Sequence, residues 1–177
     1  MKMKRLLGML VAVAMVVAFS SIAMGAKPLK DYNAIEVEAF VVPPNTPAPD
    51  MSGEDIADKI VYQVRRYAQK YGEFDAIVRE GKQEIPAGHK ILLIKGEVTE
   101  YSRPTVGRRI GRSFIPGGEY TGTAYFAAHY QFVDKATGEV VYETDLRTSS
   151  SGSDDTVDYA MLRNAEAAAK YIYSLEK

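Results

Sequence analysis

The sequence predicts an α+β fold in which an antiparallel sheet of four to five strands packs against two helices as a two-layer sandwich. Several segments alternate apolar and polar residues, which is typical of strands whose sheet is buried on one face and solvated on the other. Two further segments, residues 52–71 and the stretch after residue 155, carry apolar residues at helical spacing. Their apolar stripes are expected to cover the buried face of the sheet.

The first 25 residues have the pattern of a secretory signal peptide. A basic head at positions 2–5 precedes an unbroken apolar run at positions 6–19, and small residues follow. This order predicts export and cleavage after Gly25, with cleavage after Ala26 as the close alternative. An uncleaved membrane anchor is the competing interpretation, because a helix of this apolar stretch could span about 30 Å of hydrocarbon.

The remaining residues, 26–177, are predicted to form one domain that is periplasmic or secreted. The chain has no cysteine, so we expect no lipid attachment, no disulfides and no thiolate zinc site. The whole sequence has 22 Lys and Arg against 23 Asp and Glu, and loss of Lys2, Lys4 and Arg5 leaves a net charge of −4. This mildly acidic balance argues against nucleic acid as a partner.

The first half of the domain is predicted to contain a strand, a helix and a short strand. Ala34–Val42 alternates apolar and polar residues, and a proline-rich connector that forbids regular structure follows it. Ser52 with Asp55 three residues later resembles a capping box, which predicts the start of a helix there. That helix runs to about Tyr71, and Phe74–Arg79 is predicted to be a short strand.

The second half is predicted to be a three-stranded meander followed by a helix. Lys90–Tyr101 and Glu119–Asp134 alternate over their whole length. The turn after them contains Gly138, which suits a left-handed conformation in a hairpin. Val140–Thr148 is the partner strand, with Val140 on its core face. The polar residues 149–155 form a turn whose last serine or aspartate caps the final helix.

The loop Tyr101–Gly118, inside the meander, is the strongest functional candidate. It contains no acidic residue and four basic ones: Arg103, Arg108, Arg109 and Arg112. Arginine binds phosphate or carboxylate through two parallel hydrogen bonds, and the glycines of this loop allow a ligand to approach the backbone. We therefore predict contact with an anionic ligand or partner. The alternative is a solvated hairpin loop whose arginines serve solubility.

The residue patterns do not favour catalysis, a metal or a cofactor. His89 and His129 lack the spacing of zinc ligands, and the serines of residues 149–153 lack a nucleophile elbow. One alternative is a hydrolase of envelope glycan or lipid, and a second is a structural module that self-associates through an exposed strand edge. The hydrolase would use the carboxylates that flank the arginine loop: Glu97, Glu100 and Glu119.

The order of three short motifs resembles the bacterial envelope family called domain of unknown function 4410. In that family a strand with a G-x-[IV]-T-x-[FY]-like end precedes a Gly/Arg-rich loop, and a strand, a D-x-x-T-G turn and a helix follow. The matching segments here are residues 96–101, 108–118 and 133–140. The resemblance assigns no catalytic residue. Many members are lipoproteins, and this chain lacks the lipid-attachment cysteine. Together these observations predict a non-enzymatic envelope binding or assembly-accessory domain without a cofactor.

Overall fold

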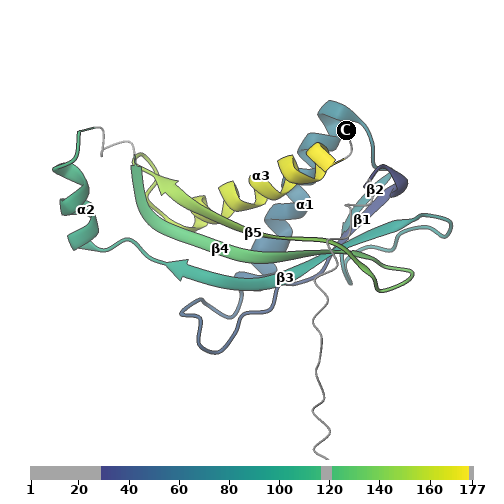
Figure 1. The fold of residues 1–177 in the computed structure, drawn as a ribbon, viewed down its shortest axis with the longest axis horizontal. Helices are drawn as coiled ribbons and strands as arrows, with labels where there is room; N and C mark the ends of the chain where they lie inside the picture. Colours follow the sequence, from purple (N-terminus) through teal and green to yellow (C-terminus); the bar gives the residue numbers. More distant parts are fainter. Residues whose placement is uncertain (1–28, 117–120, 176–177) are drawn as a thin grey trace, which may run out of the picture.

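Two long helices lie on one face of a twisted sheet in the computed structural model, which describes residues 29–116 and 121–175 (Figure 1). The predicted signal peptide, residues 1–25, lies outside these residues. Within them, five strands form one sheet in the order β2-β1-β3-β4-β5. The elements after a short 3-10 turn at Leu29–Asp31 are β1 (Ala34–Val37), α1 (Ser52–Tyr71), β2 (Ala76–Arg79), β3 (Ile91–Ser102), α2 (Val106–Ser113), β4 (Thr121–Asp134), β5 (Val140–Ser151) and α3 (Val157–Leu175).

The α+β class and the two-layer arrangement are confirmed, but the sheet is mixed instead of antiparallel. β1 runs parallel to β2 on one side and to β3 on the other. β3, β4 and β5 pair antiparallel, as the predicted meander requires. Neighbouring parallel strands need a crossover connection, which α1 provides between β1 and β2. Alternation of apolar and polar residues carries no information on strand direction, so the parallel pairs could not be read from it.

The core lies between the sheet and the two long helices. Leu92, Ile94 and Val98 of β3 are fully buried, as their alternation predicts. Phe126 and Tyr130 of β4 lie on the same buried side, with no exposed surface. The apolar stripe predicted for the last helix is confirmed at five positions of α3: Val157, Met161, Ala165, Ala168 and Ile172. The side chain of Leu175, predicted to continue that stripe, lies outside the described part of the chain.

The beginning of α1 is determined by packing and not by a side-chain cap. Met51 occupies the N-cap position without a side-chain hydrogen bond, so the predicted capping box of Ser52 and Asp55 is wrong. The backbone N–H of Phe40 donates to the Gly53 carbonyl at 3.1 Å. A Cβ atom on Gly53 would lie 1.9 Å from the Phe40 carbonyl oxygen. The first turn of α1 therefore packs directly on the backbone of the chain that precedes it.

Two strand ends, those of β1 and β5, differ from their predicted positions by three residues or more. β1 ends at Val37, short of the predicted Val42, and the chain rejoins the sheet only through one isolated bridge in the described residues. β5 continues to Ser151 and takes up part of the predicted polar turn. Val141 is buried and the predicted Val140 is exposed, because the pairing register between β4 and β5 shifts beside them. Such a shift exchanges the two faces of a strand locally.

Side chains from the long helices bind backbone carbonyls of the outermost strands. On β2, the carbonyl of Ile77 accepts hydrogen bonds from Arg65 Nε at 2.9 Å and Nη2 at 2.6 Å. On β5, the carbonyl of Leu146 accepts one from Asn164 Nδ2 at 2.9 Å. Carbonyls that already have partners are poor templates for pairing with another chain. At least one carbonyl on each outer strand is thus occupied by a helix side chain.

The Asn164 side chain links β4, α3 and β5, and its loss should destabilise the fold. It is fully buried, and its Oδ1 accepts a hydrogen bond of 2.6 Å from the Tyr130 hydroxyl. Asn164→Leu leaves the Tyr130 hydroxyl without its acceptor and the Leu146 carbonyl without its donor. We therefore expect the free energy of unfolding to fall by about 2–4 kcal/mol. Denaturant unfolding followed by circular dichroism measures the change. Tyr130→Phe, which removes one of the two bonds, should cost about half as much, and unchanged stability of Asn164→Leu would contradict the account.

Candidate functional site

A short helix stands away from the sheet at one end of the molecule, within the segment predicted to be a loop (Figure 1). α2 connects β3 to β4, and the N–H of Arg109 donates to the Thr105 carbonyl at 3.0 Å. Pro104 precedes the helix and Pro116 follows it, and no proline interrupts the residues between them. We call residues 103–116 the arm. The predicted loop Tyr101–Gly118 overlaps the connection between β3 and β4, but Tyr101 belongs to β3 and the predicted irregular conformation is wrong over the eight residues of α2. Gly118 lies outside the described residues.

The predicted arginines of the arm do not converge on one point. The guanidinium of Arg103 lies 5.9 Å from the centre of the Tyr101 ring. Arg109 Nε lies 3.2 Å from a carboxylate oxygen of Asp155, and the Arg109 side chain is 53% exposed. Arg108 and Arg112 belong to α2, but their side chains lie outside the described part of the structure. The arm is thus a basic surface whose described arginines have different neighbours.

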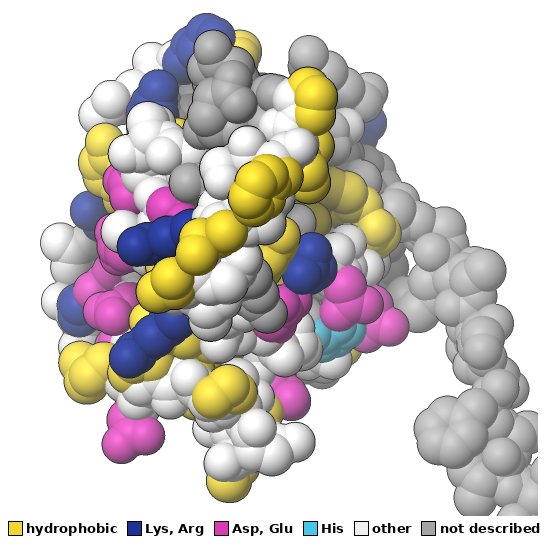
Figure 2. All heavy atoms as spheres, turned by 90° about the vertical axis from the view of Figure 1, so that its left-hand side faces the viewer, with side chains coloured by type: hydrophobic (Ala, Val, Ile, Leu, Met, Phe, Trp, Pro, Cys, Tyr) yellow, Lys and Arg dark blue, Asp and Glu magenta, His cyan; other side chains and the backbone are white. Residues whose placement is uncertain are grey.

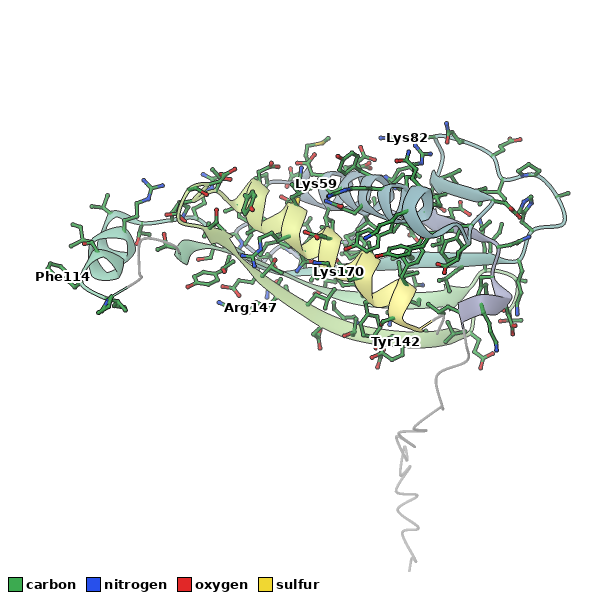
Figure 3. All side chains as sticks on the ribbon, turned by 90° about the horizontal axis from the view of Figure 1, so that it is seen from above. Lys59, Lys82, Phe114, Tyr142, Arg147 and Lys170 are labelled. Atoms are coloured by element: carbon green, nitrogen blue, oxygen red, sulfur yellow. The ribbon has the colours of Figure 1, made fainter. Side chains whose placement is uncertain are left out.

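An exposed apolar face of the arm was not predicted. Val106, Ile110 and Phe114 are 73%, 53% and 82% exposed, and the neighbouring Ile115 is 62% exposed. Positions four residues apart lie on the same side of a helix, so Val106 and Ile110 share a face of α2, and Phe114 directly follows the last residue of this helix, Ser113. Figure 2, which looks onto this end of the molecule, shows a band of hydrophobic side chains with Lys and Arg beside it. In Figure 3 Phe114 lies at the far end of the arm and points away from the sheet.

The Asp155 carboxylate, just before α3, joins the base of the arm to the sandwich. Its Oδ1 accepts hydrogen bonds from the N–H groups of Thr123 at 2.6 Å and Ala124 at 3.1 Å and from Ser150 Oγ at 2.7 Å. Its Oδ2 accepts from Thr123 Oγ1 at 2.8 Å and from Arg109 Nε at 3.2 Å. Burial raises the pKa of this carboxyl, but the hydrogen bonds from Thr123, Ser150 and Ala124 outweigh burial and hold its pKa well below the usual range.

The cap of α3 also differs from the prediction of a serine or aspartate. Thr156 Oγ1 accepts a hydrogen bond of 3.1 Å from the N–H of Tyr159, as an N-cap hydroxyl does. Asp154 instead accepts a bond from the Thr156 hydroxyl. Asp155, the last aspartate of the predicted turn, does not cap the helix and instead binds the start of β4, Ser150 and Arg109 of the arm.

The carboxylates proposed for a hydrolase do not form an acid–base pair in the described residues. Glu100 is held by Arg147, whose Nε lies 2.6 Å from Glu100 Oε2. Glu97 lines an open cavity of about 300 Å³ on the solvated sheet face together with His129, and Glu100 does not line it. His129 Nδ1 lies 2.9 Å from Asp145 Oδ1. The third predicted carboxylate, at position 119, lies outside the described residues.

Within residues 29–116 and 121–175 no group of His, Asp or Glu side chains is arranged to hold a metal ion. In the same residues no helix combines the length and the apolar character needed to cross a bilayer.

Comparison with known proteins shows a shared fold at low sequence identity. No family model matches the chain, and no curated protein matches it. The solved structure of PelC from Paraburkholderia phytofirmans, a dodecamer, matches with a TM-score of 0.55 and 11% identity over 83% of this chain and 91% of that chain. The protein XCC0632 from Xanthomonas campestris, of the DUF330 family, matches with a TM-score of 0.48 and 12% identity over 80% of this chain and 83% of that chain.

A third solved structure is lipoprotein GNA1162 from Neisseria meningitidis. It has a TM-score of 0.42 and 11% identity over 80% of this chain and 98% of that chain. At this level of identity the match to PelC shows the fold alone. The resemblance to domain of unknown function 4410 is not confirmed by any of these matches.

Replacement of Asp155 should cost stability at neutral pH and little in acid. Because its pKa is lower in the folded than in the unfolded protein, the ionised carboxylate stabilises the fold above about pH 4, and this contribution is lost as the pH falls further. We expect Asp155→Asn to lower the free energy of unfolding by about 2–3 kcal/mol at pH 7. Urea unfolding from pH 7 down to about pH 2 measures the difference between the two proteins, which should begin to shrink below about pH 4.

The matched control for this substitution is Asp158→Asn. The Asp158 side chain is 77% exposed and paired with Lys59. An exposed ion pair contributes less than about 1 kcal/mol. A change at Asp155 as small as the one at Asp158 would show that the carboxylate does not hold the fold.

Proposed function

We propose that this protein is a non-enzymatic, envelope-associated binding or assembly-accessory domain and that the arm is its contact element for an anionic partner. In this proposal residues 1–25 are a signal peptide and the remaining chain is one periplasmic or secreted domain. Membership of the family called domain of unknown function 4410 belongs to the same proposal. The observation that carries it is the arm itself, which projects from a closed two-layer body and presents basic and apolar residues to solvent.

The charge distribution supports an anionic partner. The arm holds Arg103, Arg108, Arg109 and Arg112 and no acidic residue, whereas the chain as a whole is slightly acidic. A local positive surface on an acidic protein directs the approach of anions to that surface. Guanidinium groups also match phosphate and carboxylate geometry better than lysine does. The arm therefore differs in charge from the body that carries it.

The construction of the body supports a division between a scaffold and a contact element. Most core residues and the Asn164 hydrogen bonds belong to the sheet and the two long helices, and the arm contributes none of them. The arm joins this body through the chain ends of β3 and β4 and through the Arg109–Asp155 contact. Substitutions in the arm should therefore change binding without unfolding the protein.

The proposal is tested by the triple substitution of Arg108, Arg109 and Arg112 by serine. The purified protein should be retained on a phosphate-bearing cation-exchange matrix at pH 7 and low salt, although its net charge is negative, and the variant should pass through. The free energy of unfolding should change by less than about 1 kcal/mol, because the Arg109 side chain is half exposed and Asp155 keeps its hydrogen bonds to Thr123, Ala124 and Ser150. Retention is measured by the salt concentration at elution.

A matched triple variant separates the arm from general charge. Lys30, Arg66 and Lys70 are exposed basic residues of the body, and their replacement by serine removes the same charge. This control should remain on the matrix. Equal loss of retention in both variants, or unfolding of the arm variant, would contradict the proposed role of the arm.

A further inference from the structure

The apolar face of the arm lacks a partner in the described body. α2 has eight residues, and helices shorter than about 12 residues are marginally stable in water without packing. Arg109 of α2 makes a polar contact with Asp155, which lies just before α3. Val106, Ile110 and Phe114 are mostly exposed. A single exposed apolar residue needs no explanation, but several gathered on one short segment indicate an interaction surface. The partner must therefore provide an apolar environment.

The described surface offers no matching apolar patch to a second copy of the chain. The other exposed large hydrophobic side chains in residues 29–116 and 121–175 are dispersed over the β1–α1 connection, α1 and β5: Val41, Met51, Tyr62, Tyr71 and Val140. The carbonyls of Ile77 and Leu146 on the outer strands are also occupied by helix side chains. A second copy could satisfy the arm only by pairing arm with arm, which would bring arginines together. A lipid surface has no such restriction.

We propose that the arm lies in the interface of an anionic phospholipid bilayer, with the side of Val106, Ile110 and Phe114 toward the acyl chains. This inference rests on the proposed function and names its partner. Helices that lie on membranes combine an apolar side with arginine or lysine on the polar side, and anionic lipids strengthen their binding. Helix periodicity places positions 108 and 112 on the side of α2 opposite to position 110. The sequence puts arginine at both of these positions.

The geometry of the molecule permits this contact without rearrangement of the body. The arm is at one end of the sheet, and Phe114 points away from the sheet (Figure 3). The Arg109–Asp155 contact holds the base of α2 beside the start of β4 and α3. The body can thus stay in water while α2 rests on the surface, which is the arrangement of a peripheral protein and not of a spanning one.

The absence of tryptophan from the sequence allows a site-specific test. Phe114→Trp places a lone indole on the apolar face, and Tyr62→Trp places one at an exposed position of α1 as the matched control. With vesicles of phosphatidylethanolamine and phosphatidylglycerol, Phe114→Trp emission should shift to the blue and be quenched by brominated acyl chains. Tyr62→Trp emission should stay unchanged. Vesicles of phosphatidylcholine alone should bind weakly.

Binding strength gives the second measurement. Phe114→Ser should weaken vesicle binding about tenfold, the effect of removing one large apolar side chain from a buried position, while leaving retention on the phosphate matrix intact. Matrix retention without a fluorescence shift would overturn the lipid inference and leave the proposed function standing. If the protein showed neither matrix retention nor a fluorescence shift, the proposed function and the lipid inference would both be overturned. A blue shift that depends on protein concentration without vesicles would show arm–arm pairing instead and overturn the inference.

Discussion

The carboxylate of Asp155 is the constraint that relates the arm to the rest of the molecule. It accepts hydrogen bonds from the N–H groups of Thr123 and Ala124, from the Ser150 hydroxyl and from the Arg109 guanidinium. These groups come from the start of β4, the end of β5 and α2, which are far apart in sequence. A charged acceptor suits this position because ionised hydrogen-bond partners are stronger than neutral ones. The arm could not keep its orientation if those chain ends separated.

The body and the arm differ in how they expose apolar and charged side chains. In the body, apolar side chains are buried, and helix side chains such as Arg65 and Asn164 occupy carbonyls on the outer strands. These features limit unwanted pairing with other chains. In the arm, Val106 and Phe114 remain exposed, and the segment itself contains four arginines and no acidic residue. An exposed apolar and basic segment on an otherwise well-packed domain is best explained by a binding partner. This is the basis of the proposed membrane contact.

Sequence patterns predicted those parts of the fold that local spacing determines. The range of α1, the alternation of β3 and the left-handed Gly138, with φ of 73°, all depend on neighbouring residues. The parallel pairing of β1 and the role of Asp155 depend on segments that are remote in sequence, so spacing could not reveal them. α2 was missed because two glycines weaken its helix signal, although the four-residue spacing of Val106, Ile110 and Phe114 was visible.

The most direct test of the arm as a membrane contact is hydrogen–deuterium exchange of the protein with and without vesicles that contain phosphatidylglycerol. The account predicts that amides of residues 106–113 exchange more slowly when vesicles are present, because lipid contact stabilises a helix that is marginal in water. Amides of β3 and β4 should exchange at the same rate in both conditions. Equal exchange of the arm with and without vesicles, or protection confined to the sheet, would contradict the central claim.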